Sequence, residues 1–473
     1  MTSKPHRMHP ISLLLFAYES MKKVAFPLII VLLGIGRTFS LVWITVIITA
    51  LIVLLILLNF LDYFMFTYQV LEDEIIIRSG VFVKKVNHVP YDRIQNVTTN
   101  QWFFLKPFGL EELEIETAGQ SDKAEVQLKA VPDSLKEEIN RLRNNDTVTI
   151  DSEQPQENTY TISWRNLLKF SLTSPAYFSA ILAVVVLYGK VKDIIDQDIY
   201  QNMSSRMAHA NLLIITAAVL LVLFIFYLGS AALIISKYYH FQLIKDNGQL
   251  QMTRGLFQSR KTTISMKRIQ SVVIKQSLLR GFLKIATIQL VIVSNSKEDD
   301  TEKDIIIMPV IAIDQVEKFL QQFLPQVPVK EMNFKPFKWT YYYELRNATL
   351  WAIPTIGFLV WLVFPKMWFI VGIIILGMFF WYVPAILTAQ RSKIQVLNKN
   401  FLVLQNNKIM TKQVNYIPKS RIQYVERRSS LWLERKGIAS LLIYVRSGNS
   451  QRTFSVNYQV EKDVDEILAW YKA

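Results

Sequence analysis

Three arginines stand in the same tripeptide, RIQ, and have the chemistry to bind phosphate. The tripeptide occurs at residues 93–95, 268–270 and 421–423. A guanidinium group grips a phosphate with two parallel N–H donors, which makes Arg93, Arg268 and Arg421 candidate receptors for an anionic headgroup. The alternative is structural: in an extended segment the isoleucine points into a core, while the arginine and glutamine hold backbone carbonyl groups. Both interpretations require a strand at this place in each copy.

Pairs of cations add weaker candidates for headgroup binding in the second and third copies. They are Arg260, Lys261, Arg427, Arg428, Arg435 and Lys436. Regions 237–347 and 390–473 carry net charges of +7 and +9, against −6 for region 62–170. Each cation close to an anionic leaflet gains about 1 kcal/mol, whereas nucleic-acid binding needs aromatic residues interleaved with the cations. We therefore expect anionic inner-leaflet lipids as partners and no nucleic acid.

The sequence contains no motif that is typical of a catalytic site. The 473-residue chain has no cysteine, and its five histidines are scattered without metal-ligand spacing. It has no glycine-rich phosphate loop and no nucleophile elbow. The sequence predicts no catalytic residue, no metal site and no cofactor, and therefore a protein that is not an enzyme.

Six apolar segments in three pairs precede the RIQ copies and must hold them at a membrane. The pairs are 24–36 with 39–61, 176–189 with 211–236, and 348–364 with 367–390. About 20 apolar residues cross a hydrocarbon core about 30 Å thick, so the longer run of each pair predicts a transmembrane helix. The first run has 13 residues, and its place in the repeated pattern favours a span that ends at Arg37.

The distribution of cations orients these spans. An even number of spans between polar regions places every polar region on one side of the membrane. Cations flank the helices on that side, among them Lys22, Lys23, Lys237, Arg391 and Lys393, while the hairpin tips carry few. By the positive-inside rule we expect the polar regions and both termini in the cytoplasm.

The polar regions are three copies of one small module. Glycine lies 13 residues before the arginine at Gly80 and Gly255, and Lys408 takes that place in the third copy. Strand–turn–strand patterns surround each RIQ, and an amphipathic helix closes each copy, with capping residues at Ser134, Asp314 and Asp463. We expect each module to be an antiparallel β sandwich or open barrel capped by its helix.

The RIQ phrase, the preceding glycine turn and the closing helix resemble the bacterial pleckstrin-homology-like (PH-like) family, bPH2 or DUF304, whose domains flank paired transmembrane helices. The resemblance implies an integral membrane α-helical plus α+β protein with three tandem units, each a two-helix hairpin followed by a PH-like domain. The expected bounds are hairpin 1 with its lead-in at 1–61, domain 1 at 62–145, a linker at 146–175, hairpin 2 at 176–236, domain 2 at 237–325, a lead-in at 326–347, hairpin 3 at 348–390 and domain 3 at 391–473.

The resemblance also implies a multi-pass protein of the bacterial plasma membrane that pairs with a smaller single-unit relative and takes part in envelope defence. From the residues we expect a non-enzymatic assembly protein that presents three cytoplasmic domains. Two alternatives stay open. One is a transporter-like or immunity protein against membrane-active antimicrobial peptides, and the other is a sensor of anionic lipid headgroups.

Overall fold

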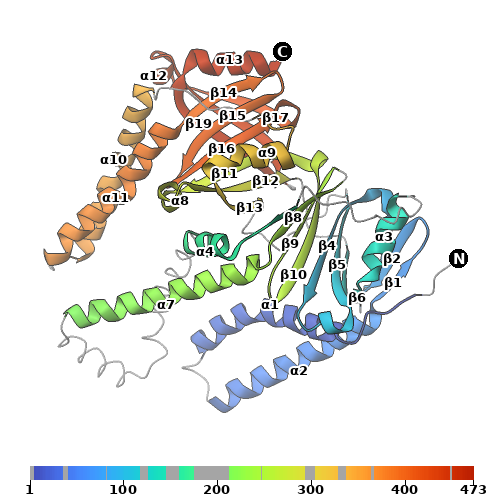
Figure 1. Cartoon of the computed structure of the whole chain (residues 1–473). Helices are drawn as coiled ribbons and strands as arrows, with labels where there is room; N and C mark the ends of the chain where they lie inside the picture. The colour runs from blue at the N-terminus through green and yellow to red at the C-terminus, as the bar shows by residue number, and fades with distance from the viewer. Residues whose placement is uncertain are drawn as a thin grey trace. The chain divides into compact units, whose positions relative to one another are not determined.

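The computed structural model of the chain (Figure 1) describes most of its residues. They are 5–35, 41–80, 83–117, 126–144, 159–174, 212–246, 248–292, 304–328, 337–363, 367–447 and 450–472. The chain forms two compact units, Met1–Ile244 with Leu250–Ile264 and Lys245–Gln249 with Ser265–Ala473. Each unit joins strands that belong to two different RIQ copies.

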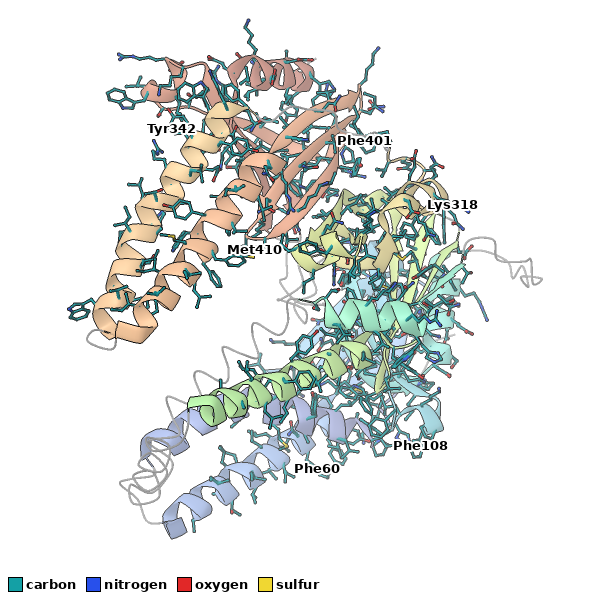
Figure 2. All side chains as sticks on the ribbon, turned by 60° about the vertical axis from the view of Figure 1, so that its left-hand side comes forward. Phe60, Phe108, Lys318, Tyr342, Phe401 and Met410 are labelled. Atoms are coloured by element: carbon teal, nitrogen blue, oxygen red, sulfur yellow. The ribbon has the colours of Figure 1, made fainter. Side chains whose placement is uncertain are left out.

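The long, apolar helices described in the first unit are α1 (Ser12–Ile35), α2 (Leu41–Met65) and α7 (Leu212–Tyr238). Helix α4 (Trp164–Leu172) is short and amphipathic. The lead-in before segment 24–36 is helical, so α1 has 24 residues and is longer than the apolar run alone. Side chains along α2, such as Phe60, project outward and stay exposed (Figure 2). The predicted segment 176–189 lies outside the described residues.

The second unit contains a pair of packed helices, α10 (Lys338–Val363) and α11 (Met367–Arg391). Thr355 Oγ1 of α10 accepts a hydrogen bond from Trp381 Nε1 of α11 at 2.9 Å, and the hydroxyls of Thr349 and Tyr382 lie 2.9 Å apart.

Among the described residues, three helices have a stretch long and apolar enough to cross a membrane. The stretches are Ile48–Met65, Val219–Tyr238 and Ile370–Arg391.

The first unit has two antiparallel sheets. The smaller has the order β1 (Thr67–Val70), β2 (Glu74–Ser79), β3 (Lys85–Pro90). The larger has the order β6 (Val126–Pro132), β5 (Leu110–Thr117), β4 (Ile94–Trp102), β10 (Gln258–Ser265), β9 (Gln249–Arg254), β8 (Gln242–Asp246), β7 (Thr159–Thr161). Helix α3 (Ser134–Asn144) buries Leu135 and Ile139 in a core with Ile75, Val97 and Leu113. Copy 1 thus contributes three strands to each of two sheets and ends in the closing helix that the sequence predicts.

The second unit repeats this plan. Its six-stranded sheet has the order β13 (Ile305–Ala312), β12 (Ile285–Ile292), β11 (Ile269–Ser277), β16 (Thr411–Pro418), β15 (Phe401–Lys408), β14 (Lys393–Asn398). Its three-stranded sheet is β17 (Ile422–Arg428), β18 (Ile438–Ser447), β19 (Ser450–Val460). Helices α9 (Val316–Phe323) and α13 (Glu461–Lys472) close copies 2 and 3. Helix α13 begins at Glu461, so the expected cap, Asp463, lies inside the helix.

The copies share their large sheets, which differs from the expectation of self-contained modules. Strand β4 of copy 1 pairs with β10 of copy 2, and β11 of copy 2 pairs with β16 of copy 3. Both junctions have one register: the ninth residue after an RIQ arginine, Trp102 or Ser277, lies opposite the tenth residue before the next arginine, Gln258 or Thr411. The junction is therefore a repeated interface.

Candidate membrane-surface site

The RIQ tripeptides lie where a single 3-10 turn passes into a strand. The turns are η1 (Tyr91–Arg93), η3 (Met266–Arg268) and η5 (Lys419–Arg421), and each following isoleucine begins a strand. Ile94 and Ile422 are buried in the cores of copies 1 and 3. Such burial is what the structural interpretation of the motif requires.

The RIQ arginines have different surroundings. Arg93 is exposed and Arg268 is half-buried. Arg421 donates a hydrogen bond to the backbone carbonyl of Lys267, across the junction between copies 2 and 3. This contact is a structural use of the guanidinium group.

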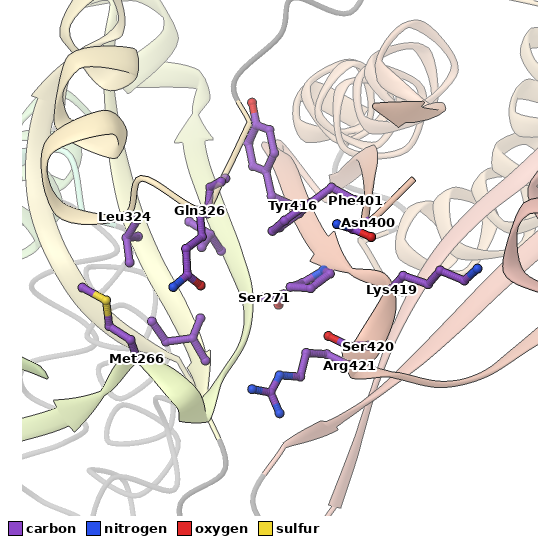
Figure 3. Close-up of a pocket in the computed structure, with 14 residues that line it drawn as sticks. Met266, Ser271, Leu324, Gln326, Asn400, Phe401, Tyr416, Lys419, Ser420 and Arg421 are labelled. Carbon is purple, nitrogen blue, oxygen red and sulfur yellow. The ribbon is translucent and has the colours of Figure 1, made fainter. Parts of the chain in front are cut away.

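Arg421 also lines a pocket of about 410 Å³ at the same junction (Figure 3). Ser271, Gln326 and Tyr416 contribute polar side chains to its wall. The Ser271 hydroxyl is buried and has no hydrogen-bond partner in the described structure. Burial raises the pKa of Tyr416, with a further contribution from Glu317, so the phenol is neutral at physiological pH.

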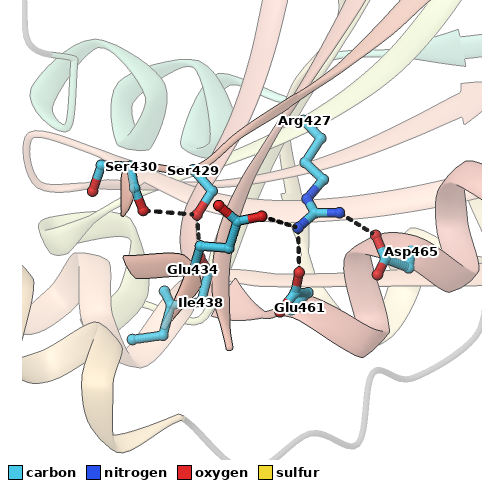
Figure 4. Close-up of polar contacts among 7 residues, drawn as sticks. All are labelled: Arg427, Ser429, Ser430, Glu434, Ile438, Glu461 and Asp465. Atoms are coloured by element: carbon cyan, nitrogen blue, oxygen red, sulfur yellow. Dashed lines mark hydrogen bonds and ion pairs between the residues drawn. The ribbon is translucent and has the colours of Figure 1, made fainter. Parts of the chain in front are cut away.

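Two candidate cations of copy 3 are held by carboxylates. Arg427 contacts Glu461, lies 3.1 Å from Asp465 and 4.0 Å from Glu434 (Figure 4). Arg428 lies 2.6 Å from Glu426. The pairs of Arg427 fix strand β17 against helix α13 of the same domain, whereas Arg428 pairs with a carboxylate of its own strand. Both guanidinium groups are therefore already bound to anions.

The candidate cations of copy 2 lie on β10, where Arg260 and Lys261 are opposite Asn100 and Thr99. Lys261 is close enough to the buried carboxyl group of Glu111 to oppose the rise that burial causes in the pKa of that group. The first junction thus uses this cation electrostatically within the fold.

The chain after each of the strands β4, β11 and β17 forms a short projection, which we call the knob: residues 102–109, 277–284 and 430–437. In every copy, the side chain eight residues after the RIQ arginine donates to the carbonyl seventeen after it. The pairs are Gln101 Nε2 to Leu110 O (3.3 Å), Gln276 Nε2 to Ile285 O (3.2 Å) and Ser429 Oγ to Ile438 O (2.8 Å). Serine in copy 3 therefore makes the bond that glutamine makes in copies 1 and 2 (Figure 4).

The last residue of each knob has a left-handed backbone, with φ of 61° at Gly109, 52° at Lys284 and 64° at Gly437. Its carbonyl accepts a backbone hydrogen bond from a residue at or just before the closing helix. The donors are Asp133 (3.0 Å), Ile313 (3.1 Å) and Glu461 (2.9 Å). The knob is thus fixed at its base to its own domain.

The knobs present large apolar side chains to the outside. The exposed members are Phe103, Phe108, Leu279, Phe282, Leu283, Leu431 and Trp432. Phe282 is 84% exposed, Leu431 77% and Trp432 75%. Large apolar side chains that gather on an exposed surface are typical of an interaction site.

The knobs of copies 1 and 2 each lie beside an exposed turn of the next copy. This turn comes directly before the third strand of that copy's first sheet, β10 or β16. Phe103 N donates to Phe257 O at 2.8 Å, and the two rings meet at 6.3 Å. Knob 2 begins at Ser277, opposite Thr411, which follows the exposed Ile409. Knob and turn thus form one apolar rim at the first junction, and strand pairing brings knob 2 next to the equivalent turn at the second.

These turns are attached to the ends of the apolar helices. Leu256 N donates to Ser236 O of α7 at 2.9 Å. Asn407, near the end of β15, donates to Ile409 O of the second turn at 2.6 Å and accepts a hydrogen bond from Arg391 Nη1, at the end of α11, at 2.9 Å. The exposed rim therefore starts where the candidate spans stop.

Cations and aromatic rings accompany the rim. Burial, and then repulsion from Arg391 and Lys393, lowers the pKa of Lys412, which marks a concentration of positive charge beside the end of α11. In knob 3, Arg435 lies 6.0 Å from the ring centre of Trp432, and Lys436 lies 4.5 Å from that of Trp339 at the start of α10. Aromatic and cationic side chains together are typical of a membrane interface.

The sequence contained a signal for the knobs. The matched residues ten and eleven places after the arginine, Phe103 with Phe104, Leu278 with Leu279, and Leu431 with Trp432, are apolar in all three copies. Their spacing shows repetition, but the sequence alone does not separate a buried apolar pair from an exposed one.

Comparison with known proteins agrees with this repeated construction. The family model "Bacterial PH domain" (bPH_2) matches residues 23–145, 194–326 and 350–473. The chain is also 25% identical over 352 residues to the UPF0699 transmembrane protein YdbT of Bacillus subtilis (strain 168), a match that covers 70% of this chain and 71% of that protein. The resemblance drawn from RIQ, the glycine turn and the closing helix is thereby confirmed: the chain is a membrane protein with three matched repeats and belongs to the bacterial PH domain family.

Proposed function

We propose that this protein is a non-enzymatic scaffold of the plasma membrane, whose bacterial PH domains rest on the cytoplasmic leaflet by their knobs. The helices anchor the chain, and the rim of knobs and turns enters the headgroup layer. The cations that flank the helices support the cytoplasmic side.

The exposure of the knobs supports this proposal more than any other observation. Water-exposed Phe, Leu and Trp side chains cost free energy, and full burial of one such side chain is worth about 1.5–3 kcal/mol. A tryptophan also suits the interface because its ring is apolar and its N–H finds a partner there. Because three equivalent knobs carry such residues, the free energies gained when the knobs enter the headgroup layer add together.

The charge of copies 2 and 3 supports an anionic leaflet as the surface. Lys412, Arg435 and Lys436 accompany the rim, and each cation near such a leaflet contributes about 1 kcal/mol. Recognition of the leaflet by its charge is therefore part of the proposed function, in line with the alternative of a headgroup sensor.

The depth of a knob can be measured with one label, because the natural chain has no cysteine. Full-length Leu431→Cys, labelled with an environment-sensitive fluorophore, is reconstituted into vesicles of phosphatidylcholine with or without phosphatidylglycerol. The matched control is Lys399→Cys, in the exposed turn at the other end of β15 from Ile409.

Nitroxide-labelled lipids should quench the label at position 431 strongly and the label at position 399 weakly. Phosphatidylglycerol should increase the quenching at position 431. Equal quenching at the two positions would refute seating of the knob, and indifference to phosphatidylglycerol would refute recognition of charge.

A further inference from the structure

The two outermost strands at the ends of the repeat are complementary. At each internal junction, the first strand of a copy's second sheet pairs with the third strand of the next copy's first sheet. The same places are held by β17 at the end of copy 3 and by β3 at the start of copy 1. Both are edge strands of three-stranded sheets within the part of the chain that the structure describes.

We propose that β17 of one molecule pairs with β3 of a second copy of this chain, which continues the internal junction from molecule to molecule. The fixed register of the internal junctions sets the register of this contact. In both internal junctions, the residue seven places after one RIQ arginine lies opposite the residue eight places before the next RIQ arginine. The pairs are Asn100 with Arg260 and Lys275 with Gln413. Arg428 of one molecule therefore lies opposite Lys85 of the next.

Exposure at the two edges agrees with a missing neighbour. Val86 on β3 is 51% exposed, and Tyr424 on β17 is 41% exposed. Ser271 holds the place of Tyr424 in copy 2 and is fully buried. A strand added at β17 would remove this difference in exposure between Tyr424 and Ser271.

Cations on the two edges do not argue against pairing. Charged residues often protect an edge strand from association. In this fold, however, Arg260 lies opposite Asn100 and Lys412 opposite Gln276 within the closed junctions. Arg428 is moreover compensated by Glu426 on its own strand.

The knob supplies a second part of the contact. In the first junction, Phe103 of knob 1 meets Phe257 of the following turn. Leu431 holds the place of Phe103 in copy 3 and is exposed, and the turn of copy 1 presents the exposed Val83. One added copy covers the edge and the side of knob 3 together.

A head-to-tail contact of this kind leaves a new β17 edge at the end of every added molecule. Such an interface is heterologous, and it produces a closed ring or an open filament rather than a two-fold dimer. This consequence separates the proposal from ordinary dimerisation.

Disulfide formation between differently tagged full-length chains in one membrane tests the register. One chain carries Arg428→Cys and the other Lys85→Cys, both at exposed positions. The control replaces Lys85→Cys with His88→Cys, which is exposed on the same strand, about 10 Å further along at about 3.3 Å per residue.

We expect the mixed-tag dimer to exceed the control by roughly tenfold, because cysteines whose Cα atoms are more than about 7 Å apart are not bridged without backbone movement. A chain with both Lys85→Cys and Arg428→Cys should give a ladder of multimers or one closed ring. Equal yields with the control would overturn the proposal, as would capture of a different, single-unit protein at position 428 in place of the second copy. Neither result bears on the depth of the knobs, which the fluorescence experiment measures independently.

Discussion

At the scale of single residues, the end of each knob requires a left-handed backbone, and copy 2 meets this requirement with lysine. Lys284 has a φ of 52°, where copies 1 and 3 have Gly109 and Gly437. A residue with a Cβ atom pays about 1–2 kcal/mol for this conformation, whereas glycine adopts it freely.

We predict that Lys284→Gly raises the free energy of unfolding by about 1 kcal/mol, because glycine relieves the strain. Chemical unfolding in detergent measures the change. Gly437→Ala is the matched variant and should shift stability by a similar amount in the opposite direction. A destabilised Lys284→Gly protein would contradict this account of the turn.

Glycine before RIQ shows how far single residues can be predicted. A Cβ atom at Gly80 or Gly255 would lie within about 2 Å of a backbone oxygen, which explains these two glycines. In copy 3 a shorter turn follows Lys408, and Ile409 takes the positive φ of 60°. The sequence shows that glycine is missing there, but the shorter turn becomes visible only in the strand pairing.

At the scale of elements, the knob depends on one side-chain bond at its base. Ser429 makes this bond to Ile438 in copy 3, where glutamine makes it in the other copies. The equivalence could not be predicted, because it depends on how closely two strands approach at that point.

We predict that Ser429→Ala costs about 1 kcal/mol of stability, the usual net contribution of one hydrogen bond. Ser429→Gln should retain most of the stability, because glutamine spans the same gap in copies 1 and 2. Chemical denaturation compares the two variants with the natural protein. An equal loss for alanine and glutamine would mean that the bond is not the stabilising feature.

The packing of α10 against α11 depends on a glycine. A Cβ atom at Gly377 would lie 2.5 Å from a side-chain carbon of Ile356, while one at Gly372 would meet nothing within 4 Å. Gly377→Leu should therefore lower the free energy of unfolding by about 1–3 kcal/mol through overpacking. Gly372→Leu controls for helix propensity, which rises equally in both variants. Equal thermal stability of the two variants in detergent would exclude close packing at Gly377.

Helix starts were partly predictable. Helix α3 begins at Ser134, within a residue of the start that its capping pattern predicts, while α13 begins at Glu461, before Asp463. Hydropathy found the apolar runs but not the lengths of α1 and α10, because polar and aromatic lead-ins are continuous with these helices. Amphipathic segments at a membrane surface keep a helical backbone without an unbroken apolar run.

At the scale of the whole molecule, the repeat was predictable and the sharing of sheets was not. Three RIQ copies with residues matched at fixed offsets predict three modules, and the three matches to the family model confirm them. An edge strand carries the same alternation whether its neighbour comes from its own copy or the next one. The pairing of β4 with β10 therefore leaves no mark in the sequence.

The central claim is that all three copies lie on the cytoplasmic face of one membrane. The most direct measurement is labelling of single cysteines by a membrane-impermeant maleimide in intact and lysed cells. Asp73→Cys, Asp246→Cys and Lys399→Cys place one exposed thiol in each copy, and Arg37→Cys marks the predicted outer tip of hairpin 1.

The account predicts that the three domain positions react only after lysis, while position 37 reacts in intact cells. Labelling of position 73, 246 or 399 from outside an intact cell would contradict it.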